Sequence, residues 1–114
     1  MIILRPDQAI FEIHADFCSI LSNTTRIMIM WLLVNGEKSV TELADALELS
    51  IPNVSQHLRI MRDKGAVLTR KEAQNVYYRI SNPKFIQGYM LIREGILEQS
   101  GIRMEELSGS EDIE

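Results

Sequence analysis

Residues 51–64 carry polar side chains that could form hydrogen bonds to a ligand from one face of a helix. At 3.6 residues per turn, Gln56 points directly away from the apolar side, with Asn53 and Arg59 about 60° to either side of it. The apolar residues are three, four and three positions apart, as expected for one buried face: Ile51, Val54, Leu58 and Met61.

The chemistry of this polar face suits the edges of nucleic-acid bases. Amide, hydroxyl and guanidinium groups hydrogen-bond base edges in a major groove that is wide enough to admit a helix. Ser55 and His57 flank the face, and Ser50 precedes the helix as a cap. The free amides at a helix N-terminus also favour phosphate. Any surface helix has a polar face, however, so this pattern alone is equally compatible with a solvated helix.

A second group of polar side chains follows in residues 67–80, where the hydrophobic period changes to two. Residues 67–72 alternate, and residues 76–80 are rich in β-branched and aromatic types, which predicts a β-hairpin. A basic hairpin next to a helix-turn-helix can contact the DNA backbone or enter the minor groove. The candidate contact residues of the hairpin are Arg70, Lys71, Gln74, Asn75 and Tyr77, with Arg79 nearby.

The charge is unevenly distributed along the chain. The 114 residues have a net charge of −4, yet residues 50–84 contain seven basic and two acidic side chains. Residues 101–114 contain one basic and five acidic side chains. Salt screens charges over about 8–10 Å, so local charge governs what a surface attracts. We therefore expect a basic face on a domain of residues 1–100, followed by an acidic, flexible tail over residues 101–114.

The elements that must position these side chains are mainly helical. We expect a helix from about residue 6, an apolar central helix through residues 26–33, a helix after the capping box of residues 39–42, the helix of residues 51–64, the hairpin, and a last helix from residue 83 to about residue 98. Two capped helices separated by a few residues form a helix-turn-helix. The predicted fold is mainly α with a small β-hairpin, a winged helix-turn-helix.

Three segments, within a match over residues 17–96, resemble the ArsR/SmtB family of dimeric repressors. They are residues 49–65, residues 21–27 with the pattern L-x-N-x-x-R-I, and residues 69–78, whose sequence is closest to the HlyU/BigR branch. The resemblance implies a transcriptional regulator that represses by binding an inverted-repeat site on double-stranded DNA. It implies base contacts from Ser55, Gln56 and His57, and a homodimer formed through the first and last helices.

The sensory sites of that family do not carry over to this sequence. The cysteine motif of arsenic sensors is replaced by Ser39-Val40-Thr41, and residues 82–98 contain no histidine or aspartate for zinc. Trp31 stands where the HlyU/BigR branch has a cysteine in the second helix. We therefore expect no cofactor, and the sequence names no effector.

His14 and Cys18 are the candidates for a different sensor. They are four residues apart on one helical face, and imidazole and thiolate suit zinc or copper(I). Two ligands make an incomplete site, so a packed cysteine and a solvent-facing histidine is the favoured interpretation, with a redox thiol as a further alternative. We expect no metal site.

Several functional classes are disfavoured by the sequence. It contains no Ser/His/Asp arrangement or glycine-rich phosphate loop, so we do not expect an enzyme. The apolar stretch at the start of the chain is too short to be the apolar region of a signal peptide. No apolar run approaches the roughly 20 residues of a membrane helix. With a single cysteine, the composition suits the cytoplasm. The alternative function is a protein-interaction module of the same fold that does not bind specific DNA.

Overall fold

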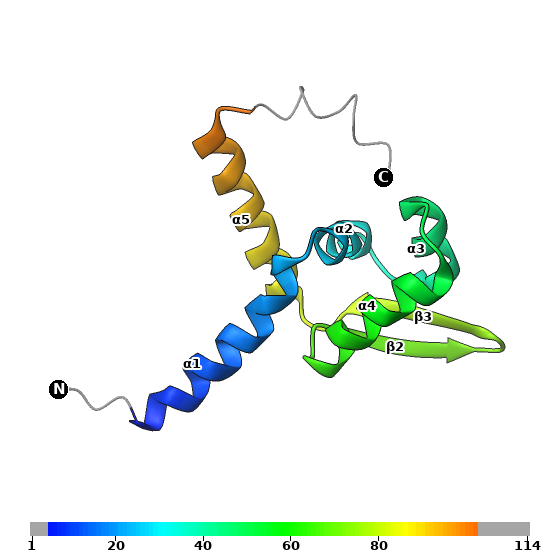
Figure 1. Ribbon diagram of the computed structural model, residues 1–114, viewed down its shortest axis with the longest axis horizontal. Helices are drawn as coiled ribbons and strands as arrows, with labels where there is room; N and C mark the ends of the chain where they lie inside the picture. The colour runs from blue at the N-terminus through cyan, green and yellow to red at the C-terminus, as the bar shows by residue number, and fades with distance from the viewer. Residues whose placement is uncertain (1–4, 103–114) are drawn as a thin grey trace.

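Helices and a small sheet alternate along the chain in the predicted order. The computed structural model describes residues 5–102 (Figure 1). Its elements are α1 (Arg5–Cys18), a 3-10 turn η1 (Ser19–Ser22), α2 (Thr24–Leu33), β1 (Lys38–Ser39), α3 (Val40–Leu47), α4 (Ile51–Asp63), β2 (Val67–Glu72), β3 (Asn75–Ile80) and α5 (Pro83–Ser100). The prediction of a mainly helical winged helix-turn-helix is confirmed. The predicted tail over residues 101–114 lies almost entirely outside the described residues.

Side-chain caps fix the starts of α2, α3 and α4, and those of α3 and α4 were predicted from the sequence. The Ser39 hydroxyl accepts a hydrogen bond from the Glu42 amide at 3.0 Å, and the Glu42 carboxylate accepts one from the Ser39 amide at 2.8 Å. Asn23 and Ser50 accept equivalent bonds at the starts of α2 and α4. Between α3 and α4, Glu48 adopts a left-handed conformation with φ of 57°, which turns the chain within three residues.

The sheet has three antiparallel strands in the order β1-β3-β2, one more than the sequence predicted. The additional strand, β1, has two residues and pairs Lys38 with Tyr78 and Ser39 with Tyr77. It was missed because two residues cannot display a period-two pattern. In the hairpin, Glu72 pairs with Asn75. The turn is therefore Ala73–Gln74, and Asn75 begins β3.

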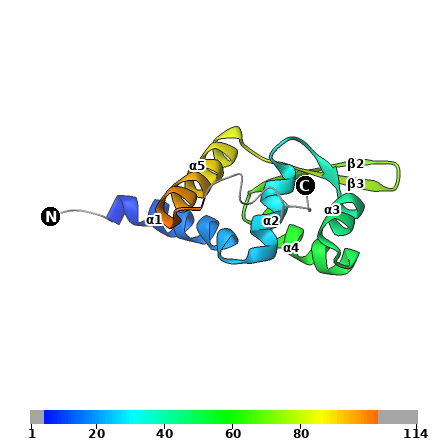
Figure 2. The ribbon, with the colours of Figure 1, turned by 90° about the horizontal axis from the view of Figure 1, so that it is seen from above.

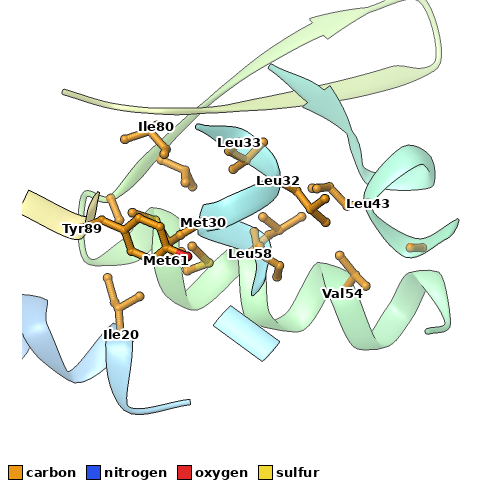
Figure 3. Close-up of a cluster of buried hydrophobic side chains, with 14 residues drawn as sticks. Ile20, Met30, Leu32, Leu33, Leu43, Val54, Leu58, Met61, Ile80 and Tyr89 are labelled. Atoms are coloured by element: carbon orange, nitrogen blue, oxygen red, sulfur yellow. The ribbon is translucent and has the colours of Figure 1, made fainter. Parts of the chain in front are cut away.

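The core lies around α2 and is built from the buried faces of the neighbouring elements (Figure 3). Figure 3 places Leu33 of α2 below the sheet and Leu58 of α4 on the opposite side of the cluster. The Tyr89 hydroxyl donates a hydrogen bond to the Ile27 carbonyl at 3.0 Å, which joins α5 to α2. This core fixes α4 and the sheet relative to one another. None of the helices within residues 5–102 is both long and apolar enough to cross a bilayer.

Candidate nucleic-acid interface

The rotation of α4 is fixed by three side chains that the core buries completely. Val54, Leu58 and Met61 each have 0% of their surface exposed. Three residues predicted for the opposite face, Asn53, Gln56 and Arg59, are all exposed; we call these three residues the polar stripe. The prediction that Ile51 is buried is wrong. Ile51 is 46% exposed, because it is the first residue of α4 and lies at the edge of the core.

The two serines of this region are less available to a ligand than the residues of the polar stripe. Ser50 is exposed, but its hydroxyl already accepts a hydrogen bond from the Asn53 amide at 3.2 Å. Ser55 is half-buried on the side of α4. The Ser50 hydroxyl can still donate its proton to a ligand, because the cap uses only its acceptor lone pair.

His57 is half-buried rather than fully presented on the helix surface. Its Nδ1 atom is buried and has no hydrogen-bond partner among the described residues. Burial lowers the pKa of His57, and the positive charge of Arg26 lowers it further. The ring is therefore neutral at neutral pH. Arg26, whose Nε donates to the Ile20 carbonyl at 3.1 Å, was not among the predicted site residues, although it is the arginine of the segment over residues 21–27.

The hairpin of β2 and β3, which we call the wing, extends beyond the helices (Figure 1). Lys71, Gln74 and Asn75 are exposed near its tip, and Tyr77 is half-buried. Both views place α4 alongside the wing, with the start of α4 on the side of the wing tip (Figures 1 and 2). The start of α4 and the tip of the wing therefore lie toward the same end of the molecule.

Arg70 is engaged by acidic side chains. Its Nε and Nη2 atoms donate to the two carboxylate oxygens of Glu37 at 3.2 and 2.5 Å. Its Nη1 atom donates to Glu72 at 2.7 Å, and its guanidinium lies 4.6 Å from the centre of the Tyr77 ring. We call these four residues the Arg70 cluster. Glu37 was not a predicted site residue, because the strand that brings it to the wing was not predicted.

The strand register places the basic side chains of the wing on two faces. Arg70 pairs with Tyr77, and Leu68 pairs with Arg79, so these four side chains share one face. Lys71 lies on the other face, and no ion pair involves it within residues 5–102. Lys71 and the polar stripe are therefore available to phosphate and bases, whereas Arg70 must first exchange partners.

Helices α1 and α5 expose large apolar side chains away from the polar stripe. More than half of the surface is exposed for three residues on each helix: Ile10, Phe11 and Ile13 on α1, and Leu91, Ile92 and Ile96 on α5. A hollow of about 400 Å³ lies between the two helices, where the rings of Phe17 and Phe85 meet with centroids 4.4 Å apart. Single exposed apolar residues are ordinary, but several of them on two helices that share an apolar hollow mark an interaction surface.

His14 and Cys18 both line this apolar hollow, and both are exposed. Within the described part of the chain, no group of three or more histidine, cysteine, aspartate or glutamate side chains could hold a metal ion. Within the described residues of one protomer these two side chains are thus a pair of donors, whereas structural zinc takes four ligands.

Comparison with known proteins identifies the chain. The family model for bacterial regulatory proteins of the arsR family matches residues 23–67, which run from the cap of α2 to the start of β2. The structure of HlyU from Vibrio cholerae is similar with a TM-score of 0.69 and 36% identity, covering 73% of this chain and 90% of that one. The chain belongs to the ArsR family. The resemblance noted in the sequence is thereby confirmed.

Curated relatives and a further solved structure are similar to the chain as well. The transcriptional activator HlyU of V. cholerae is 47% identical over 62 residues, which are 54% of this chain and 57% of that protein. The biofilm growth-associated repressor of Xylella fastidiosa is 36% identical over 73 residues, 64% of each chain. The matches thus span less than two thirds of these curated relatives. A homodimeric winged helix-turn-helix DNA-binding domain from Mycobacterium bovis, 26% identical, has a TM-score of 0.78, covering 82% of this chain and 87% of its own.

Proposed function

We propose that the protein binds double-stranded DNA sequence-specifically as a homodimer and represses transcription from the bound promoter. The observation that carries this proposal is the exposed polar stripe, held by a fully buried opposite face beside a basic wing. The repressor from X. fastidiosa and the DNA-binding domain from M. bovis support the same role. The protein acts by binding rather than by catalysis, and its target implies a cytoplasmic location.

In this proposal α4 enters the major groove. Gln56 offers an amide that can pair with adenine through two hydrogen bonds, and Arg59 offers a fork that matches guanine. Asn53, Ser55 and His57 contact neighbouring base edges or sugars, and Ser50 contacts a phosphate at the start of the helix. Because α4 is held by the core on its opposite side, the stripe needs little reordering on binding.

The wing supplies contacts that set affinity and register. Lys71 is the exposed basic side chain nearest the tip of the wing, and Gln74 and Asn75 can hydrogen-bond phosphate or the minor groove. Tyr77 supports Arg70, which serves as a phosphate contact only when it leaves its acidic partners. Phosphate contacts carry little sequence information, so the wing stabilises any complex and α4 selects the site.

The homodimer forms through the apolar faces of α1 and α5. Burying six large apolar side chains that are more than half exposed in one protomer gives a strong driving force, since each buried square ångström contributes about 25 cal/mol. A twofold axis through this interface places two copies of α4 about one DNA turn apart, roughly 34–36 Å. A dimer bound across a promoter excludes polymerase, which is the proposed mechanism of repression.

Selection of binding sites from a random pool of duplexes tests this function. We expect an enriched inverted repeat, and binding to it that weakens as salt rises. Gln56→Ala should relax the preference at one base position per half-site by about 1–3 kcal/mol. Gln99→Ala, a matched change at an exposed position near the end of α5, should leave the preference unchanged.

Two outcomes would count against the proposal. If no duplex is enriched and none binds at low salt, the DNA-binding function is wrong, and a protein-interaction role takes its place. If an inverted repeat is enriched but Gln56→Ala binds it with unchanged preference, α4 does not read the sequence.

A further inference from the structure

The wing contains an arginine whose hydrogen-bonding edge is already occupied by an acidic side chain. Both oxygens of Glu37 accept hydrogen bonds from Arg70, through Nε at 3.2 Å and Nη2 at 2.5 Å. This bidentate arrangement is the one that a guanidinium group also forms with phosphate. Glu37 thus occupies a guanidinium edge of the kind through which arginine binds phosphate.

The contact joins distant parts of the chain. Glu37 and Arg70 are 33 residues apart, and Glu37 directly precedes β1, which pairs with β3. The short strand therefore brings the carboxylate to the outer face of the wing. Local sequence preference cannot account for such a contact, because it depends on the pairing of three strands.

The surface charge of this face is cancelled by the same arrangement. Arg70 and Arg79 provide two positive charges, and Glu37 and Glu72 provide two negative charges. Arg70 and Arg79 both lower the pKa of Glu37, so its carboxylate stays ionised at the pH at which DNA binds. Around Arg70 the wing thus offers no net positive charge to a phosphate.

The cluster is nevertheless accessible to a duplex. The side chain of Arg70 is 48% exposed and that of Glu37 is 35% exposed. The guanidinium has five N–H donors, and only three take part in the contacts with the two glutamates. A phosphate can therefore approach Arg70 and compete for it without unfolding the wing.

We propose that Glu37 acts as an internal competitor for DNA, limiting affinity by holding Arg70 in place of a phosphate. This inference rests on the proposed function, and it names Glu37 as an affinity-setting residue of the DNA-binding surface. The competition makes the wild-type protein weaker on any duplex than its basic side chains alone predict. Because the wing then contributes less to binding, α4 accounts for more of the difference in affinity between DNA sequences.

A purely structural role for the cluster predicts the opposite result. If Glu37 served only to stiffen the wing, its loss would make the wing less ordered and DNA binding weaker. The sign of the change in affinity therefore separates the two roles.

The test compares Glu37→Gln with the wild-type protein on a random-sequence duplex and on a selected site. We expect Glu37→Gln to bind both roughly tenfold more tightly at 50 mM salt, with the gain shrinking toward none at 200 mM. This follows from one new phosphate contact per protomer, each of which steepens the salt dependence by about 0.9. Glu94→Gln, at an exposed position on α5, makes the same change in net charge away from α4 and the wing and should give a much smaller gain.

A double variant shows whether the gain passes through Arg70. Arg70→Gln alone should weaken wild-type binding, because it leaves Glu37 and Glu72 facing the DNA with only Arg79 to balance them. Glu37→Gln combined with Arg70→Gln should lose the gain. If wild type binds DNA and Glu37→Gln binds equally or more weakly, or if the double variant keeps the gain, the inference is wrong. If wild type binds no duplex at all, the proposed function itself has failed.

Discussion

The surroundings of a single residue, His57, give the molecule a defined response to pH. Its Nδ1 atom is buried without a partner among the described residues, and Arg26 lies close enough to oppose a second positive charge. Both effects disfavour the protonated ring in the folded protein. The unfolded chain, with an ordinary histidine pKa near 6.5, binds the proton more readily.

The resulting prediction concerns stability in weak acid. Because the folded pKa of His57 is lowered, this residue's contribution to stability is fully present above about pH 6.5 and is lost as the pH falls below that value. The free energy of unfolding of the wild type should therefore decrease between pH 7 and pH 5. His57→Gln should show a smaller decrease in denaturant titrations. An equal decrease in both proteins would contradict the assignment.

For single residues, spacing along the sequence predicts the exposed face of a helix but not contacts between distant segments. Helical periodicity placed Asn53, Gln56 and Arg59 correctly on the exposed face, because a helix of known register fixes directions by arithmetic. It could not predict that Arg70 is held by Glu37. That contact depends on a carboxylate 33 residues away in the sequence, brought near by the pairing of strands.

At the scale of elements, the start of α3 is set by a reciprocal cap. The Ser39 hydroxyl and the Glu42 carboxylate each satisfy a backbone amide that the helix leaves free. Such signals are local, and for that reason the helix starts capped by Ser39 and Ser50 could be predicted from sequence. Strand β1 has two residues and no local signal, so only the tertiary structure shows it.

The cap gives a second prediction. Ser39→Ala should lower the free energy of unfolding by about 1 kcal/mol, within a range of 0.5–2, because one amide of α3 loses its partner. Thr41→Ala, an exposed change in the same helix, should have a much smaller effect. Denaturant titration of the two variants measures both values. Equal losses would mean that the cap does not determine the stability of α3.

At the scale of the whole molecule, α1 and α5 have apolar faces that remain exposed to solvent in a single protomer. Phe11 and Ile92 are 57% and 55% exposed. The sequence predicted that these helices dimerise, and the exposed side chains support that prediction. Periodicity reveals an apolar face but cannot say what covers it, because the same pattern serves a core and an interface.

A charge placed on this face separates the two possibilities. Ile92→Glu should leave the protomer folded, since the side chain already contacts solvent, but should convert the dimer to a monomer in sedimentation equilibrium. Leu68→Glu, at a 43% exposed position on the wing, is the matched control and should leave the dimer intact. A monomeric wild type, or a dimeric Ile92→Glu, would contradict an interface through α5.

The most direct test of DNA recognition by α4 is methylation protection of guanine N7 in a selected duplex, since N7 lies in the major groove. Two copies of α4 in a symmetric dimer should protect two groups of guanines about 10–10.5 base pairs apart, and Gln56→Ala should weaken both groups equally. Saturating binding that leaves every N7 reactive, or that protects a single group, would contradict the account.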